Sequence, residues 1–433
     1  MTTSWTPPDE VSRQQIQDAS DTLLARPDVV VESREVVLRI RSLGLDWDVA
    51  GTLFSPTDPD DVTVGPDGRR VGVLLQHGGD VDHRAMTPHG DLLARKLGYR
   101  VFAMTMPGRY NLTDPSRDWP GDTINPDGTV RTPLWAVDDP ITPDQYDLVE
   151  DRSDPAKRAK WGTLFFLAAR PGTRFHHRMA SWPVAFDDAV AEVCRRFFPA
   201  DEYSVYTHGH STGGPFAHLA LQRVENAVGL LGMETSPFGS VYSRMLGMSW
   251  DHPFTHLTIR TWRHIAKYVG AESDPQEIRR LPWLMEDVFD AWAKARTSPQ
   301  FKAEYVVSYG SVPALTAAAR ATAARLGLDA DATATLVARY CGYAAPLEGP
   351  DARPLPPLLY GITAGSRDHT RERYEDVLLP ALAALDRPPL ARVVRFDGGV
   401  HGYAEPEPGL PLGLLPAVCA LWDEAIGSGY YLR

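Results

Sequence analysis

The sequence predicts an α/β fold, a mostly parallel, doubly wound sheet of about eight strands with a helical lid. Short apolar runs rich in β-branched and aromatic residues recur along the chain, and helical patterns separate them. The later runs are continuously apolar, which is typical of strands buried on both faces of a parallel sheet. Two long segments interrupt the alternation, and insertions of that size are usually functional.

Eight runs are expected to be strands. The first two form a candidate hairpin at a sheet edge, because they follow each other closely. The expected strands are 29–40, 47–54, 71–78, 99–107, 203–209, 227–234, 355–365 and 391–399. Helical patterns lie at 89–98, 183–198, 214–225, 374–385 and about 413–426.

The chain is expected to form a single domain over 1–433. Its core would comprise about 28–108, 181–239 and 351–433. The segment 109–180 is rich in Pro, Asp and Trp, and 240–350 has several helical patterns. We expect these two insertions to form the lid over a site.

Composition limits the function classes. The formal net charge of −12 over 433 residues argues against nucleic acid or an anionic membrane as a partner. The first residues lack the pattern of a signal peptide, and no apolar window is long enough for a membrane span. Cys194, Cys341 and Cys419 are far apart, without metal or redox spacing. We therefore expect a cytoplasmic protein without cofactor or metal that acts on a small molecule; its oligomeric state is left open, a homodimer included.

A G-x-S-x-G pattern, "GHSTG", spans 209–213. An apolar strand runs into it and a helical pattern leaves it, which is the setting this nucleophile motif requires. The flanking glycines allow a tight, strained turn that exposes the hydroxyl of Ser211. The helix that follows directs its N-terminal N–H groups at developing negative charge. The pattern predicts a nucleophile at Ser211.

A serine hydroxyl needs a base. The best candidate is His401 in "FDGGVHGYAEP", because it follows the last strand, lies among glycines and comes after the serine in the chain. The order serine, acid, histidine is the one expected for this strand–turn–helix motif. We expect His401 to be the general base.

An oxyanion hole needs two backbone N–H groups. One is expected from Thr212, the residue after the nucleophile. The other is expected from the loop "QHGGD", where Gly78, Gly79 and Asp80 are the candidates. The sequence does not choose among the three.

The same loop supports a competing hypothesis, a metal site, because metallohydrolases use dense His/Asp loops. The candidate ligands are His77, Asp80, Asp82, His83, His89 and Asp91. No second ligand cluster at strand ends accompanies them, and an oxyanion role explains "HGG" sufficiently. We therefore favour a site without metal.

Taken together, "LLQHGG", "GYRVFAMTMPGR", "GHSTGG", "GSRDH" and "GGVHG" resemble the α/β-hydrolase superfamily in order and position. The resemblance covers the chain apart from its two insertions and implies a Ser-His-acid triad. One departure lies at "MPGRYN", where relatives commonly have an Asp-x-x-Gly-x-Gly-type turn. Thr105 and Tyr110 stand in its place.

Two carboxylates compete for the acid position. Asp368 lies after the seventh strand, where most of the superfamily carries the acid. Glu234 directly follows the sixth strand, and a carboxylate at the end of an apolar strand needs a partner. The surrounding sequence is similar to a small bacterial esterase subgroup, and this resemblance implies a glutamate acid. We favour Glu234, with Asp368 as the alternative; the other carboxylate would order the histidine loop.

The insertions carry aromatic side chains that predict a largely apolar pocket roof. They include Trp119, Trp135, Trp161, Phe165, Phe166, Tyr242, Trp250, Tyr268, Trp262, Trp283 and Trp292. Of these we expect Trp250 to line the substrate pocket, together with His210 and Asp80.

These features predict a carboxylesterase-like serine hydrolase for a bulky, apolar or aromatic ester, acting through an acyl-enzyme. The same groups also cleave lactones, amides, carbamates and C–C bonds next to a ketone, and the fold does not discriminate among them. A different class, a non-catalytic binding member of the fold, would retain a ligand without turnover.

Overall fold

The computed structural model describes most of the sheet and its covering helices. The described ranges are 10–42, 44–78, 82–105, 107, 142–151, 164–170, 173–211, 213–235, 320, 323–324, 327–334, 355–366, 371, 374–375, 379 and 388–433. Most of the two expected lid insertions therefore lies outside the described residues, and so does most of the expected helix 374–385.

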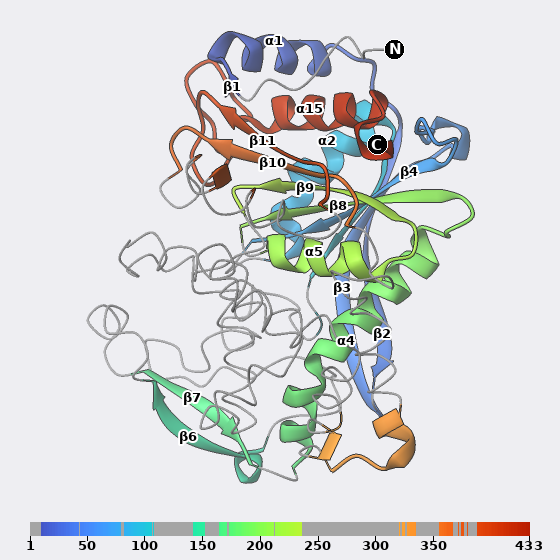
Figure 1. The fold of residues 1–433 in the computed structure, drawn as a ribbon, viewed down its shortest axis with the longest axis vertical. Helices are drawn as coiled ribbons and strands as arrows, with labels where there is room; N and C mark the ends of the chain where they lie inside the picture. The colour runs from blue at the N-terminus through green and yellow to red at the C-terminus, as the bar shows by residue number, and fades with distance from the viewer. Residues whose placement is uncertain are drawn as a thin grey trace.

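A nine-stranded sheet forms the centre of the molecule (Figure 1), in the order β1-β11-β10-β9-β8-β4-β5-β3-β2. Its strands are β1 (Glu10–Val11), β2 (Val31–Ser42), β3 (Leu45–Pro56), β4 (Arg70–Gln76), β5 (Arg100–Met104), β8 (Tyr203–His210), β9 (Ala227–Met233), β10 (Leu358–Thr363) and β11 (Ala391–Phe396). In this sheet order, each pair of neighbouring strands from β1 through β11, β10, β9, β8 and β4 to β5 is parallel. Strand β3 runs antiparallel to both of its neighbours, β5 and β2. The eight predicted strands are all present, with the predicted hairpin β2–β3 at the edge.

Helices cover both faces of the sheet (Figure 1). They are α1 (Arg13–Leu24), α2 (Thr87–Leu97), α4 (Arg174–Phe197), α5 (Gly213–Arg223) and α15 (Leu415–Gly427). Helices α1, α2 and α15 lie on one face, whereas α4 and α5 lie on the other. Short 3₁₀ turns lie at Pro59–Asp61, His83–Met86, Pro143–Gln145 and Tyr430–Leu432. This arrangement confirms the predicted α/β-hydrolase fold.

Two elements and one helix boundary differ from the sequence prediction. Helix α1 and the two-residue strand β1 were not predicted; α1 begins with a capping box formed by Ser12 and Gln15. Helix α4 begins at Arg174, ahead of the predicted start at 183, so Pro183 lies inside the helix. A proline inside a helix removes one backbone hydrogen bond, and long helices tolerate this. Pro183 therefore does not mark the beginning of α4.

The main core lies between the sheet and the layer of α1, α2 and α15. Ile16, Leu93, Val418 and Trp422 contribute side chains with no exposed surface. The Trp422 ring meets the Tyr206 ring of β8 edge to face, with centroids 6.5 Å apart. This packing supports the central strand from behind.

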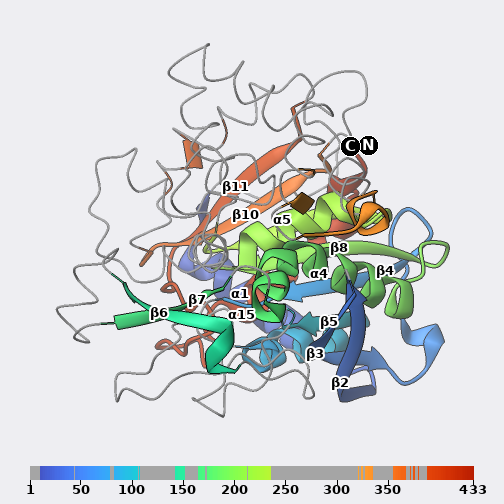
Figure 2. The ribbon, with the colours of Figure 1, turned by 90° about the horizontal axis from the view of Figure 1, so that it is seen from below.

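A second, two-stranded antiparallel sheet is formed by β6 (Tyr146–Asp151) and β7 (Leu164–Ala169). Figure 2 shows this hairpin apart from the main sheet. It belongs to the segment 109–180, which is otherwise largely outside the described residues.

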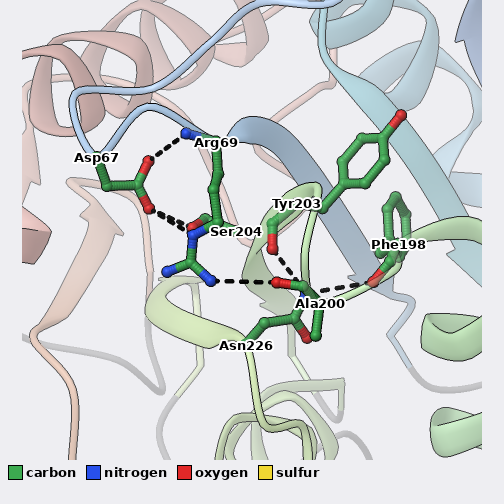
Figure 3. Close-up of polar contacts among 7 residues, drawn as sticks. All are labelled: Asp67, Arg69, Phe198, Ala200, Tyr203, Ser204 and Asn226. Carbon is green, nitrogen blue, oxygen red and sulfur yellow. Dashed lines mark hydrogen bonds and ion pairs between the residues drawn. The ribbon is translucent and has the colours of Figure 1, made fainter.

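Polar contacts fix the amino ends of the central strands (Figure 3). The Asp67 carboxylate receives hydrogen bonds from Arg69 and from the Ser204 hydroxyl at the start of β8. The buried Asn226 amide, just before β9, donates to the carbonyls of Tyr203 at 2.7 Å and Phe198 at 3.2 Å. The starts of β4, β8 and β9 are therefore held together.

Among the described residues, no helix is both long and apolar enough to cross a membrane. Cys194 and Cys419 are buried free thiols, and burial raises the pKa of Cys194 to about 12. Cys341 lies outside the described residues.

Candidate active site

The strand register brings three strand ends level at the carboxyl edge of the sheet. Gln76 of β4 pairs with Gly209 of β8, and His210 of β8 pairs with Met233 of β9. The residues that follow these strands therefore meet around Ser211. Carboxyl ends of parallel strands are the usual place for a site in this class of fold.

Ser211 lies in the turn between β8 and α5 with a φ of 52°, in the left-handed region that side chains rarely adopt. The glycines on either side allow this turn. A Cβ on Gly209 would lie 2.6 Å from the Gly213 carbonyl oxygen, and one on Gly213 would lie 2.4 Å from the Gln76 carbonyl oxygen. The motif is a strained elbow in which only glycine fits at both positions.

Residues 233–235 hold the elbow from the neighbouring strand. The Ser211 N–H donates to the Met233 carbonyl at 3.3 Å. The buried Thr235 hydroxyl donates to the Ser211 carbonyl oxygen, which also accepts the Gly214 N–H at 3.1 Å. Both backbone polar groups of Ser211 are thus satisfied by specific partners.

Glu234 directly follows β9, and its side chain has no exposed surface. Its Oε1 accepts the Thr363 N–H at 2.5 Å, and its Oε2 lies 3.4 Å from His401 Nδ1. Its own N–H donates to the Gly361 carbonyl at 2.9 Å. A buried carboxylate needs such partners, and the structure supplies both a backbone donor and an imidazole.

His401 lies on the loop after β11, as expected from the sequence. The loop turns at Gly399, where φ is 77° and a Cβ would lie 2.4 Å from Leu414 Cδ1. The Gly399 N–H donates to Glu407 at 2.6 Å, and Arg13 of α1 forms an ion pair with the same carboxylate at 2.5 Å. Helix α1 therefore helps to hold the histidine loop.

The predicted oxyanion loop reaches the elbow at Gly78. A Cβ on Gly78 would lie 3.4 Å from Ser211 Cβ and 3.2 Å from His210 Nδ1, so the backbone passes close to the serine. Further along the chain, the buried His83 is fixed to the residue that follows β5. Its N–H donates to Thr105 Oγ1 at 2.8 Å, and its Nδ1 lies 2.7 Å from the same oxygen. Thr105 thus anchors this loop.

Several predicted site residues lie outside the described residues. They are Gly79, Asp80, Thr212, Trp250 and Asp368. Tyr110 and the tryptophans of the two insertions lie outside them as well. The structure therefore brings together Ser211, Glu234, His401, His210 and Gly78.

The described members of the candidate metal cluster have separate polar partners. The pairs are His77 with the Gly78 carbonyl, Asp82 with the Arg84 N–H, His83 with Thr105, His89 with Tyr403 and Asp91 with Arg95. Among the described residues, no group of three or more His, Cys, Asp or Glu is arranged to hold a metal ion. The His/Asp-rich loop instead uses these side chains to fix its own backbone and its neighbours.

A cluster of histidines lies behind the elbow, in which His89 and His208 are buried and His210 is half-buried. Tyr403 Oη lies 2.8 Å from His89 Nδ1 and 3.3 Å from His208 Nε2. Removal from water lowers the pKa of His89 to about 3 and that of His208 well below its usual value. Burial and the neighbouring His401 lower the pKa of His210 to about 4. These three rings are therefore neutral at pH 7.

Sequence reasoning missed Thr235 and Tyr403. Thr235 adjoins Glu234, and Tyr403 lies two residues after His401, so proximity to the candidate acid and base was the available signal. Their contacts, however, join segments far apart in the chain, and only the sheet order reveals them.

No protein-family model matches the chain, and no match was found among curated proteins. Solved structures with a similar arrangement include an S-formylglutathione hydrolase from Agrobacterium tumefaciens, at 12% identity and a TM-score of 0.40, covering 93% of this chain and 99% of that one. A thermostable esterase from Pseudomonas putida is similar at 13% identity and a TM-score of 0.39, covering 97% and 89%. An acylaminoacyl peptidase from Pyrococcus horikoshii is similar at 11% identity and a TM-score of 0.41, and the match covers 91% of this chain and 41% of the peptidase. At these values the reaction has to be argued from the residues of this chain.

Proposed function

We propose that the protein is a serine hydrolase that cleaves a carboxylic ester through an acyl-enzyme, with Ser211, His401 and Glu234 as its triad. The observation that carries the proposal is the strained elbow at Ser211, with a φ of 52° at the carboxyl edge of the sheet. Strain of this kind persists where the surroundings enforce it, and it is concentrated at active sites.

In the proposed mechanism, Ser211 Oγ attacks the ester carbonyl carbon while His401 Nε2 takes the serine proton. Glu234 lies on the Nδ1 side of His401, so it would hold the imidazole in the tautomer that leaves Nε2 free to accept, and stabilise the imidazolium that forms. The negative charge on the former carbonyl oxygen would be bound by the Thr212 N–H and by an N–H of the Gly78–Gly79 segment.

Collapse of the tetrahedral intermediate breaks the bond to the alcohol oxygen, and His401 donates its proton to that oxygen. Water then attacks the acyl-enzyme carbonyl carbon while His401 accepts the water proton. The bond to Ser211 Oγ breaks, His401 returns the proton to that oxygen, and the carboxylic acid is released. We assign a bulky apolar or aromatic ester as substrate, on the basis of the tryptophans in the two insertions.

Pre-steady-state hydrolysis of a p-nitrophenyl ester of an aromatic acid tests the proposal. We expect a burst of one p-nitrophenolate per protein molecule, and an acyl adduct on the peptide that contains Ser211. A chelator should leave the turnover rate unchanged. Retention of the ester without a burst would support a binding protein instead, and loss of turnover on chelation would support a metallohydrolase.

A further inference from the structure

The loop that carries His401 is rich in glycine, and hydrogen bonds hold it in place. Glycines lie at 398, 399 and 402, and glycine backbones have the largest conformational freedom to lose. Beside the local hydrogen bond from Gly399 to Glu407, contacts with other parts of the fold therefore help to set the position of His401 relative to Ser211.

One such contact comes from the residue immediately before the candidate nucleophile. His210 Nε2 lies 2.8 Å from the carbonyl oxygen of His401, and the two rings are 5.1 Å apart. A carbonyl oxygen only accepts hydrogen bonds, so Nε2 must carry the proton and donate it. His210 itself is held at the end of β8 by its pairing with Met233.

We propose that His210 is a positioning residue, whose Nε2–H donated to the His401 carbonyl sets the spacing between Ser211 and His401. This inference rests on the proposed function. A neutral imidazole carries one proton, so when Nε2 is protonated Nδ1 is not. His210 therefore has a single N–H donor, and that donor points to the loop.

Tyr403 provides a second anchor for the same loop. Its hydroxyl lies between His89 and His208, and because it has one proton it donates to one imidazole and accepts from the other. Its ring also packs edge-on against His210, with centroids 5.2 Å apart. The loop is thus held to β8 and α2 on one side of His401, and through His210 at His401 itself.

A pair of substitutions at His210 separates the hydrogen bond from the rest of the side chain. In His210→Gln the amide Nε2 reaches the same position as the imidazole Nε2, whereas in His210→Asn the amide stops one bond short. We expect His210→Asn to slow labelling by a fluorophosphonate about 10²-fold, since small displacements of a catalytic group have effects of that size. His210→Gln should stay within about tenfold of wild type.

Steady-state kinetics with two esters that differ in acyl size complete the test. The loss in His210→Asn should appear in kcat, by a similar factor for both esters, with KM little changed. Equal rates for His210→Asn and wild type, or equal losses in both variants, would overturn the proposal. A loss confined to KM and dependent on acyl size would show that His210 lines the pocket instead.

Two controls keep the outcomes distinct. Urea unfolding confirms that each variant is folded; if His210→Asn is not, His210→Met, which has similar reach and no donor, replaces it and carries the same expected loss. Absence of labelling in the wild-type protein would contradict the proposed function. Normal labelling of the wild type together with an unaffected His210→Asn, or His210→Met where it replaces it, would contradict only the role of His210.

Discussion

Ser211 and Glu234 both have left-handed backbones, with φ of 52° and 50°, at the ends of neighbouring strands β8 and β9. Each residue follows its strand directly, and the Ser211 N–H donates to the carbonyl of Met233, the residue before Glu234. A non-glycine residue in this region is held there at a cost of about 1–2 kcal/mol. The elbow and the candidate acid therefore form two adjacent strained turns joined by one backbone hydrogen bond.

Relief of the strain at Ser211 should raise stability. We expect Ser211→Gly to have a free energy of unfolding about 1 kcal/mol higher than Ser211→Ala, because only glycine adopts this φ without a steric penalty. Both variants should be inactive. Urea unfolding of the two proteins measures the difference, and Ser211→Ala is the matched control because it lacks the hydroxyl but keeps the Cβ. A Gly variant that is less stable than the Ala variant would contradict a strained elbow.

The identity of the acid is tested by removing one charge at a time. We expect Glu234→Gln to lower kcat by at least about 10³-fold, since the imidazole loses the partner that fixes its tautomer and stabilises its cation. Asp368→Asn should lower it less. Steady-state kinetics of the two variants on the same ester give the ranking, and the reverse order would assign the acid to Asp368.

The buried histidines should make stability fall as the medium becomes acidic. In the folded protein the pKa values of His89, His210 and His218 are lowered to about 3, 4 and 3, against about 6.5 in the unfolded chain. Between these values the unfolded chain binds protons that the folded one does not. Each histidine therefore lowers the free energy of unfolding by up to about 1.4 kcal/mol per pH unit below pH 6.5, and contributes no pH dependence above it.

Urea unfolding at pH 7, 6 and 5 measures this slope. The control is His218→Gln, in which a ring that hydrogen-bonds Tyr360 at 2.7 Å is replaced by a group that does not titrate. That variant should show a smaller decrease between pH 6 and pH 5 than wild type. A stability that stays constant from pH 7 to pH 5 would contradict the assignment of these histidines as neutral in the folded protein.

The amino ends of the strands should influence stability without influencing turnover. Asn226→Ala removes the amide that donates to the Phe198 and Tyr203 carbonyls, and we expect the free energy of unfolding to fall by about 2 kcal/mol. These groups lie at the opposite end of β8 from Ser211, so kcat per folded molecule should stay at the wild-type value. A large loss of kcat in folded Asn226→Ala would mean that the site is not confined to the carboxyl edge.

The fold was predictable from the sequence because its strands are long apolar runs with strong local patterns. The two-residue strand β1 and the mostly polar helix α1 have no such pattern, and they were missed. Ser211 and His401 were identified from local motifs. By contrast, the contacts of Thr235 with Ser211 and of His210 with His401 depend on the register of the sheet and on how the histidine loop packs against it. Neither can be predicted from the local pattern of a single sequence.

Covalent labelling determines whether the serine at position 211 is activated. Wild-type protein and His401→Ala would be treated with a fluorophosphonate and analysed by peptide mass mapping. We predict stoichiometric modification of Ser211 in the wild type and none in the variant, because the hydroxyl is a weak nucleophile without its base. An unmodified Ser211 in the wild type, or modification that persists without His401, would contradict activation of Ser211 by His401.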